Sequence, residues 1–485
     1  MRNKILLVKP FIKKSSHSQD MFPPTSLGIL AHALKTHGIE YSVFDMGLGY
    51  SFRQLVDKIH ADRPTHLGVT LFTYQYKAVF QLLKQVKTVF PHLVIIAGGP
   101  HISTFREEAM RECGDISYGV VLEGEGTLVQ LMNGKDLADI KGLLFRKGQE
   151  IVFTGNPDSI VDLDSEGFPH YEGFELEKYS ARPKLMTINT TRGCPYQCIY
   201  CPVGTTIGKS LRYRSPESVV EEIRYWYGKG YRIIEIMDDN FSFKMGRVFN
   251  ICELLEKERF KNLVLNIPNG VRADKVDPYL LSRLKQVGFK VISFGVEAGS
   301  EAVLKSLKKG EDLTTIKQAI RWAVDAGLEV RLFFLIGSPT ERMEDFKNSM
   351  KITEEFAISG AYFYNIIPYP KTELYDWIAK NNYFIQKPQV YLSQVSGLDN
   401  DPVFETPQMS KEERKKAFRY AKSIEKRIYL RNIQKKLSKL GIFAYPIARL
   451  YSLDFIQRLL SRSARFRHLI YRLGCCMRHS SLLCS

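Results

Sequence analysis

The sequence has no run of about 18 or more apolar residues, although 44% of its 485 residues are hydrophobic. A helix that crosses a membrane is therefore not expected. The first apolar run covers only residues 5–8 and stops at Lys9 and Pro10, which is too short for the core of a signal peptide. We expect a cytoplasmic chain that folds into two or three domains.

Cysteine is also scarce, with eight in the whole chain. In a long chain of this kind, cysteines favour metal or redox chemistry over a disulfide framework. Cys194, Cys198 and Cys201 lie within eight positions of one another. The other five are Cys113 and Cys252, expected to be small buried side chains, and Cys475, Cys476 and Cys484, whose spacing matches no metal motif.

Acidic residues are few near the C-terminus. Residues 411–478 contain 19 Lys or Arg and 4 Asp or Glu, so they carry +15 of the net charge of +17. Apolar residues recur there at helical spacing, which is typical of a basic helix that binds an anionic membrane surface or a partner. A helix packed on the rest of the protein with a solvated charged face is the alternative, and contact with nucleic acid is a weaker one.

Short apolar runs alternate with helical patterns over the first 135 residues. This arrangement predicts an open, doubly wound (flavodoxin-like) parallel sheet, in which ligands bind beyond the carboxyl ends of the strands. Glycine at those ends lets the backbone approach a ligand closely. The predicted strands are residues 4–9, 41–45, 66–71, 93–97 and 117–122, and the helices are residues 26–37, 52–61, 75–90 and 104–113.

A hairpin is predicted around Lys147 and Gly148, followed by a polar linker at residues 156–179. A second series of six strands and helices then begins, typical of a partial (β/α)6 barrel with its chemistry at the strand carboxyl ends. Its predicted strands are residues 186–189, 233–237, 264–267, 291–296, 330–335 and 362–367. We therefore place domains at residues 1–140 and 183–385, with a hairpin and linker at 141–182 and a helical basic region at 386–485.

The three clustered cysteines follow the first strand of the second series, in the segment RGCPYQCIYCP (residues 192–202). Thiolates are the usual ligands of 4Fe–4S clusters, and three of them leave one iron open to a small ligand. A zinc site would need a fourth protein ligand at suitable spacing, and none lies nearby.

This C-x3-C-x2-C motif resembles the radical S-adenosylmethionine (SAM) superfamily. The resemblance implies that Cys194, Cys198 and Cys201 hold a 4Fe–4S cluster whose open iron is chelated by SAM. Electron transfer would then cleave SAM to a radical that abstracts hydrogen from a substrate. Tyr200 matches the aromatic residue that lies against the adenine of SAM, although a core aromatic is the alternative.

Later strand ends resemble the same family in order and spacing. The resemblance implies SAM contacts at the amino group for Asp238 and Asp239, where the family commonly has Gly-Gly-Glu, although polar residues that merely begin a loop are the alternative. It implies contacts of Arg272 with the SAM carboxylate, unless Arg272 is a surface side chain. It also implies ribose and carboxylate contacts in the segment EAGS, and a backbone site for adenine in LIGSPTE. The corresponding residues are Glu297, Gly299, Ser300 and Gly337.

The N-terminal segments PPTSLGILAHAL, GGPHIS and VVLEGEG are similar to the cobalamin-binding domain that precedes the barrel in one radical SAM subclass. The D-x-H-x-x-G motif that supplies an axial histidine to cobalt in other cobalamin proteins is absent, as is common in this subclass. A sheet that has lost cobalamin is the alternative. The candidate cofactor residues are Gly98, Gly99, His101, Gly124 and Glu125, with a surface loop position as the alternative for His101.

The resemblance implies a cobalamin-dependent methyltransferase or cyclase that acts on an unactivated carbon of a lipid-like or tetrapyrrole-like small molecule. An electron donor such as flavodoxin or ferredoxin is implied as a partner, and nucleic acid is not expected. A tRNA methylthiotransferase-like enzyme is an alternative, but its N-terminal domain brings three further cluster cysteines and this chain has only Cys113 before the barrel. A non-catalytic membrane or RNA adaptor on the same scaffold is the other alternative.

Overall fold

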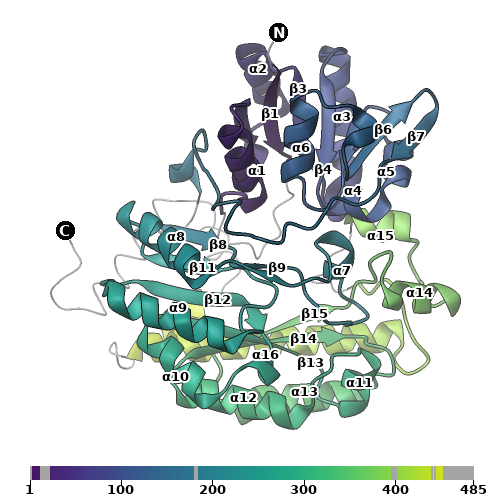
Figure 1. Ribbon diagram of the computed structural model, residues 1–485. Coiled ribbons are helices and arrows are strands. Elements are labelled where there is room, and N and C mark those ends of the chain that lie inside the picture. The colour runs from purple at the N-terminus through teal and green to yellow at the C-terminus, as the bar shows by residue number, and fades with distance from the viewer. Residues whose placement is uncertain are drawn as a thin grey trace.

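The computed structural model describes residues 3–10, 22–179, 184–394, 401–438, 441 and 444–451. Two parallel sheets, each with its own helices, form the body of the protein (Figure 1). The N-terminal sheet occupies the upper part of the view and the second sheet lies below it. The cysteine segment runs between them, which places the predicted cofactor sites at the junction of the two domains.

The N-terminal sheet has seven strands in the order β2-β1-β3-β4-β5-β6-β7. The first five are parallel, and this order places a topological switch between β1 and β3, where ligands of doubly wound sheets bind. Their bounds are β1 Lys4–Lys9, β2 Glu40–Asp45, β3 His66–Thr70, β4 Val94–Gly98 and β5 Tyr118–Val120. The predicted doubly wound sheet is confirmed.

Helices cover both faces of this sheet, as the near-continuous apolar sequence of its strands requires. α1 (Thr25–Thr36) and α6 (Glu125–Met132) pack on one face, and α2 (Phe52–Asp62) and α3 (Tyr76–Val89) pack on the other. The helix predicted at residues 104–113 is instead two short helices, α4 (Pro100–Phe105) and α5 (Glu107–Glu112). The break falls at Arg106, whose φ of 48° is incompatible with a continuous α-helix.

The predicted hairpin belongs to the first domain. β6 (Leu143–Lys147) pairs antiparallel with β5, and β7 (Glu150–Phe153) pairs with β6. The hairpin therefore extends the N-terminal sheet and covers what would otherwise be its open edge. The boundary predicted at residue 140 is wrong for this reason, and the sheet continues to Phe153.

The second sheet has six parallel strands in the order β15-β14-β13-β12-β11-β8, as predicted for a partial barrel. Its strands are β8 Leu185–Ile188, β11 Ile233–Ile236, β12 Val264–Val271, β13 Phe289–Glu297, β14 Glu329–Ile336 and β15 Gly360–Asn365. The outer helices are α8 Pro216–Gly228, α9 Met245–Glu258, α10 Pro278–Gln286, α11 Glu301–Ser306, α12 Leu313–Asp325 and α13 Met343–Glu355. The barrel is open, because its edge strands β8 and β15 do not pair with each other.

Helix α16 (Lys411–Lys436) covers the edge strand β15. The Phe363 amide donates to Glu425 at 2.7 Å, and the Lys422 ammonium donates to the Phe363 carbonyl at 3.2 Å. The basic helix thus satisfies backbone groups that an open edge would expose. Its buried side chains are Arg414, Ala417, Phe418, Ala421, Ile424 and Ile428.

One apolar face of α16 packs on the barrel, which supports the alternative of a packed helix with a solvated charged face, although Tyr420 and Tyr429 stay exposed. Contact of this helix with a membrane stays a prediction. In the parts of the chain that the structure describes, no helix is both long and apolar enough to cross a bilayer. A further short helix, α17 (Ala444–Tyr451), contacts α16. The last part of the predicted membrane-binding segment, residues 452–485 with Cys475, Cys476 and Cys484, lies outside the described residues. Membrane contact from there stays a prediction.

The two domains touch at several points. The Thr25 hydroxyl, at the start of α1, lies 3.4 Å from the Thr187 hydroxyl on β8. α15 (Pro388–Gln394) packs against the turn at Thr73–Gln75 of the first domain. The linker crosses α1 at Gly28, where an added Cβ would lie 2.7 Å from the Tyr171 ring. Only glycine fits that crossing without displacing the linker.

Candidate functional site

The three clustered cysteines lie in a loop closed by a short two-stranded ladder. β9 (Thr191–Arg192) pairs antiparallel with β10 (Arg212–Tyr213), and the loop between them carries α7 (Val203–Thr206). Gly193 starts the loop with a φ of 87°, and an added Cβ there would lie 2.3 Å from the Ser210 carbonyl oxygen. Glycine is therefore required where the loop closes on itself.

All three cysteines are free and half-buried. Burial raises the pKa of each thiol, to about 12 for Cys201, while Lys309 lies near enough to favour the thiolates of Cys194 and Cys198. Within the described residues, no three His, Cys, Asp or Glu side chains are placed to hold one metal ion. Three neighbouring free thiols in one loop fit a cluster that brings several irons, and these three residues would hold it.

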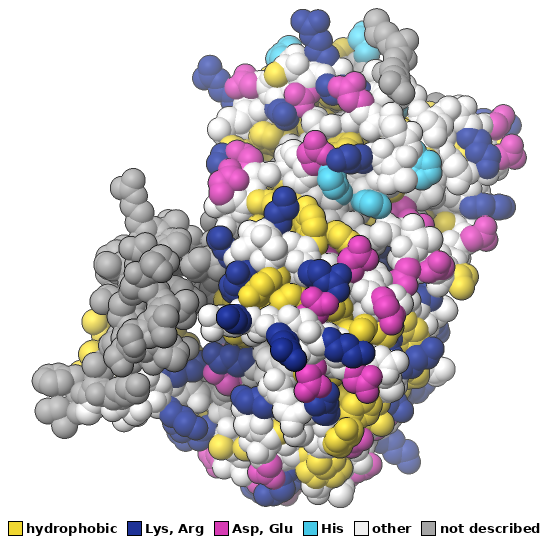
Figure 2. All heavy atoms as spheres, turned by 60° about the vertical axis from the view of Figure 1, so that its left-hand side comes forward, with side chains coloured by type: hydrophobic (Ala, Val, Ile, Leu, Met, Phe, Trp, Pro, Cys, Tyr) yellow, Lys and Arg dark blue, Asp and Glu magenta, His cyan; other side chains and the backbone are white. Residues whose placement is uncertain are grey.

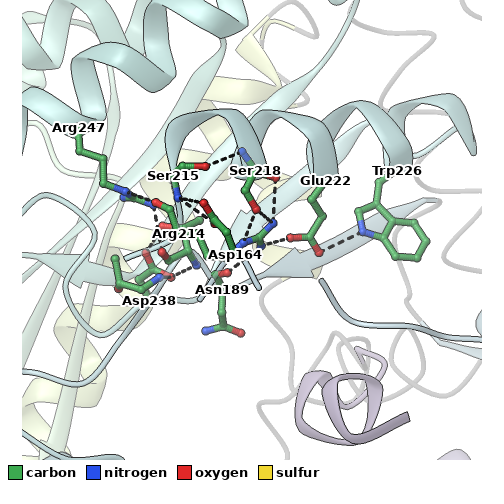
Figure 3. A network of polar contacts seen from close by, with 11 residues as sticks. Asp164, Asn189, Arg214, Ser215, Ser218, Glu222, Trp226, Asp238 and Arg247 are labelled. Carbon is green, nitrogen blue, oxygen red and sulfur yellow. Dashed lines mark hydrogen bonds and ion pairs between the residues drawn. The ribbon is translucent and has the colours of Figure 1, made fainter. Parts of the chain in front are cut away.

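A buried polar network fixes the strand that leads into this loop (Figure 3). Asp238, at the end of β11, accepts hydrogen bonds from the Thr190 amide at 2.5 Å and the Thr191 amide at 3.1 Å. Arg247 donates to the Thr190 carbonyl at 3.0 Å. Asp238 is fully buried, so the predicted contact with SAM does not fit this residue. Its carboxylate instead holds the backbone before the cysteines.

The same network continues below α8 (Figure 3). Arg214 forms an ion pair with the fully buried Glu222 and donates to the Asn189 carbonyl at 3.2 Å. Asp164 of the linker accepts from the Ser215 amide at 3.0 Å, where α8 begins. Removing one partner of such a buried pair leaves an uncompensated charge, which costs about 3–5 kcal/mol. The network therefore fixes the base of the loop firmly.

Asp239 remains the acidic candidate at this strand end. Its side chain is exposed to the space between the domains, close to Cys194 and Cys201. Loss of surrounding water in the space between the domains, together with the neighbouring Asp238, raises the pKa of Asp239 to about 6. The next residue, Asn240, has both amide atoms buried without a partner among the described residues. A polar ligand at this edge would fit these atoms, and a SAM contact of Asp239 stays a prediction.

Arg272 is engaged by the protein. It forms an ion pair with Asp274 at 2.8 Å, donates to the Lys309 and Gly310 carbonyls, and stacks on the Tyr196 ring with its Cζ 3.6 Å from the centroid. A free guanidinium for the SAM carboxylate is therefore not present, and the predicted role is corrected. Arg272 instead fixes Tyr196, which lies inside the cysteine motif.

A buried lysine that the sequence analysis did not identify lies beside the cysteine loop. Lys309 forms ion pairs with Glu297 at 3.1 Å and with Glu311 at 3.5 Å. Burial and the neighbouring Glu297 raise the pKa of Tyr200, whose ring adjoins Cys198 and Cys201. Tyr200 and Glu297 thus both lie at the loop, with Glu297 paired to Lys309, and their contacts with SAM stay predictions. Lys309 falls in the unremarkable run SLKKG, which gave no signal in the sequence.

Two glycines predicted to contact SAM have structural roles. A Cβ on Gly299 would lie 2.3 Å from the Ser349 amide nitrogen, so Gly299 permits close packing against α13. A Cβ on Gly337 would lie 2.0 Å from the Arg414 guanidinium, and the Gly337 amide already donates to Glu341 at 2.5 Å. These positions are corrected to packing roles. Ser300 is half-exposed at the start of α11, and its ligand contact stays a prediction.

A cavity of about 350 Å³ lies between the two domains at the carboxyl ends of β1, β3, β4 and β5. It contains the predicted residues Gly98, Gly99, Gly124 and Glu125, and Gly99 has a φ of 99°. The second domain contributes Asn189, Thr191, Arg192, Thr206, Ile207 and Asp239. The mainly apolar wall of the sheet, with backbone exposed at its glycines, fits a cofactor such as cobalamin, and none of the described residues that line the cavity is a histidine.

His101 does not line this cavity. Its ring is 2% exposed and packs among the rings of Tyr76, Phe80 and Phe105, with both nitrogens lacking a partner among the described residues. The predicted cofactor contact and the alternative surface position are both corrected. Burial lowers the pKa of His101 to about 3, so the folded protein keeps this ring neutral.

Replacing His101 with Phe is expected to stabilise the protein. The change removes two unsatisfied buried nitrogens, worth about 1–3 kcal/mol at neutral pH. The unfolded chain binds a proton near pH 6.5 and the folded protein does not, so stability from His101 is lost as pH falls below about 6.5. The difference in the free energy of unfolding between H101F and wild type should therefore increase by about 2 kcal/mol when the pH is lowered to 5. Thermal unfolding at pH 5–8 tests this, with H170Q as control, and a lower melting temperature for H101F at every pH contradicts it.

Comparison with known families agrees with this geometry. The sequence model of the B12 binding domain matches residues 17–132, and that of the Radical SAM superfamily matches residues 188–352. These ranges correspond to the N-terminal sheet and to most of the barrel with its cysteine loop.

Three curated proteins are similar to this chain in sequence. An uncharacterized methyltransferase of Pyrococcus horikoshii is 27% identical, over 74% of this chain and 79% of the relative. A putative methylthiotransferase of Methanocaldococcus jannaschii is 30% identical, over 57% and 61%. The anaerobic magnesium-protoporphyrin IX monomethyl ester cyclase of Cereibacter sphaeroides is 26% identical, over 73% and 60%. The chain thus spans less than two thirds of the second and third.

Among solved structures, the radical SAM methyltransferase TsrM from Kitasatospora setae, with cobalamin and a [4Fe-4S] cluster bound, matches with a TM-score of 0.72 at 17% identity. The match covers 97% of this chain and 100% of that one, and at this identity it concerns the fold. The two domain matches and the cysteine loop between a B12-type sheet and an open barrel identify the chain as a member of the radical SAM superfamily, in the cobalamin-binding subclass.

Proposed function

We propose that this protein is a cobalamin-dependent radical SAM enzyme that transfers a methyl group to, or closes a ring at, an unactivated carbon of a small molecule. One observation carries the proposal: Arg192 and Asp239, beside the cysteine loop, also line the cavity of the N-terminal sheet. A cofactor in that cavity and a cluster on Cys194, Cys198 and Cys201 would therefore face each other across one space.

When bound, the cluster supplies the electron that cleaves SAM, and cobalamin supplies methyl-transfer or redox chemistry. The protein's own residues do the rest of the work. Tyr200 and Glu297 border the cluster loop, and Asp239 presents a carboxylate to a ligand's amino group. The N-terminal sheet lies over the barrel and limits the access of water to the space between them.

The inner face of the barrel favours a substrate with polar groups. On the strands, the side chains that alternate with the outer apolar core point inward, and several of them are polar. Asn266 lies 3.5 Å from Glu235, and Ser293 has a buried hydroxyl without a partner among the described residues. Arg331 on β14 is half-exposed on the same face. We therefore favour a tetrapyrrole-like or other polar substrate over a pure hydrocarbon chain.

The electron donor is proposed to dock outside the cysteine loop. An open cleft of about 600 Å³ there is lined by Pro195, Tyr196 and Gln197 of the motif and by Lys305 and Lys308. Gln197 is exposed, so this is a surface at which the cysteine loop itself meets solvent. The cleft is lined by three lysines (Lys305, Lys308 and Lys309) and three acidic side chains (Glu301, Glu311 and Asp312), so a donor such as flavodoxin is proposed from the exposed cysteine loop and not from the charge of the cleft. We also propose that the protein is located in the cytoplasm.

Reconstitution tests the function directly. Protein purified without oxygen, and supplied with iron, sulfide and hydroxocobalamin, is expected to retain both cofactors through gel filtration. With SAM and a low-potential reductant it should release 5′-deoxyadenosine and methionine. The bound cobalamin should show a base-off spectrum, because no described residue that lines the cavity is a histidine. Protein that binds the cluster but stays colourless in excess cobalamin would remove the cobalamin part of the proposal.

The methylthiotransferase alternative has support from one relative, the putative methylthiotransferase at 30% identity. Its expected second cluster would need three cysteines before the barrel, and the N-terminal domain has only Cys113, which is 4% exposed in the core. The same reconstitution separates the two functions. Eight irons per chain would favour the methylthiotransferase, and four would favour the function proposed here.

A further inference from the structure

A compact group of ion pairs connects the N-terminal domain to the base of the cysteine loop. Arg192, two residues before Cys194, contacts Glu123 at 2.7 Å and Glu125 at 2.8 Å. Arg212, its partner in the β9–β10 ladder, also forms an ion pair with Glu123 and donates to the Ile160 carbonyl at 3.0 Å. We call Glu123, Glu125, Arg192 and Arg212 the interdomain clamp.

The clamp is shielded from solvent. Its four side chains are 7–18% exposed, whereas the ion pair between Lys35 and Glu172, which also joins the first domain to the linker, is 52% and 67% exposed. An exposed ion pair contributes about 0–1 kcal/mol to the stability of a protein, whereas two charges with little water around them attract each other more strongly. The clamp is therefore able to hold the two elements in one arrangement.

The location of the clamp gives it a functional consequence. The β9–β10 ladder has only two paired residues on each strand and, in the part of the chain that the structure describes, no other strand beside it, so it needs outside support. Besides the Asp238 network, that support comes from Glu123 and Glu125 at the start of α6 in the first domain, which also line the interdomain cavity. The sequence resemblance assigned Glu125 to a cofactor, but its carboxylate points at Arg192.

We propose that Glu123 and Glu125 are positioning residues, which act through Arg192 and Arg212 to set the cysteine loop over the interdomain cavity. The inference rests on the proposed function. It predicts that neutralising the two carboxylates disturbs the loop although no cysteine and no cluster ligand is changed. Changing residues that orient metal ligands without binding the metal typically affects activity or metal affinity by about 10–100-fold.

The test compares wild type with E123Q/E125Q and with the matched control E172Q, which neutralises the exposed pair. In all three we expect equal iron content. SAM should change the electron paramagnetic resonance (EPR) spectrum of the reduced cluster in wild type and E172Q. In E123Q/E125Q, a smaller fraction of the signal should respond to saturating SAM, and reductive SAM cleavage should slow about tenfold or more. The conservative variant E123D should recover part of the response.

Identical EPR responses and cleavage rates in wild type and E123Q/E125Q would overturn the inference. If E123Q/E125Q does not fold, the same measurements on the single variant E125Q test the inference. That variant should fold, because Glu123 still pairs with both arginines. A double-mutant cycle between E125Q and R192Q gives a second measure, and additive effects on SAM cleavage would also overturn it. A wild type that holds no cluster would instead refute the proposed function, so the two failures are distinguishable.

Discussion

Protein with Cys194, Cys198 and Cys201 all replaced by Ala is expected to bind no iron–sulfur cluster and to cleave no SAM. The three thiols lie in one loop, closed by the β9–β10 ladder and held by the Asp238 network. Thiolates are the cluster's protein ligands, and no other described cysteine lies in this loop. Iron and sulfide analysis, absorbance and SAM cleavage after anaerobic reconstitution measure the loss.

The matched control is the double variant C113A/C252A. Both of these cysteines are buried in the two apolar cores, Cys113 in the first domain and Cys252 in the barrel, so neither reaches the loop. The control should keep full iron content. A triple variant that retains four irons per chain would contradict the assignment of the cluster to this loop.

A chain that stops after Met409 is expected not to fold, whereas one that stops after Tyr451 should behave like the full-length protein. Removing α16 exposes Phe418, Ile424 and Ile428, each worth about 1.5–3 kcal/mol of burial. It also removes Arg414, which donates to the Phe404 carbonyl at 2.5 Å and the Ile336 carbonyl at 3.1 Å. The free energy lost by removing α16 thus approaches the typical free energy of unfolding of a protein, about 5–15 kcal/mol.

Soluble yield and thermal unfolding of the two truncations measure this effect. The shorter chain should be recovered as aggregate, because β15 then presents an open edge and the barrel an uncovered apolar face. A soluble protein that melts cooperatively after truncation at Met409 would show that α16 is dispensable. The chain that stops after Tyr451 also tests membrane binding. If full-length protein sediments with liposomes and this truncation does not, the residues after Tyr451 bind the membrane.

The order of strands and helices was predictable from the sequence over most of the chain. Strand β1 was predicted at its observed bounds, and the strands of the barrel differ from prediction mainly at their ends. Their apolar runs are bounded by glycine, proline and polar residues, and these local signals survive in the fold because at least one face of each of these strands packs into an apolar core. The cysteine motif was equally clear, because its spacing is itself the signal.

Residue roles at the strand ends were less predictable. Asp238, Arg272, Gly299 and Gly337 occupy the expected places in the sequence, but each is already engaged by the protein. Gly299 shows why: nothing local distinguishes a glycine that admits a ligand from one that admits the backbone of α13. His101 is a similar case, since a histidine after Gly99 and Pro100 gives no sign of the aromatic rings around it.

The sequence alone thus determined the family, the two-sheet architecture and the loop that carries the three cysteines, because spacing and hydrophobic periodicity are properties of short segments. Only the tertiary structure decided that the basic helix α16 closes the edge of the barrel, that the hairpin extends the first sheet, and that Glu123 and Glu125 meet Arg192. Each of these depends on charges or edges brought together from distant segments. No local pattern contains such a pairing, since a buried ion pair or a covered strand edge exists only when both partners are in place.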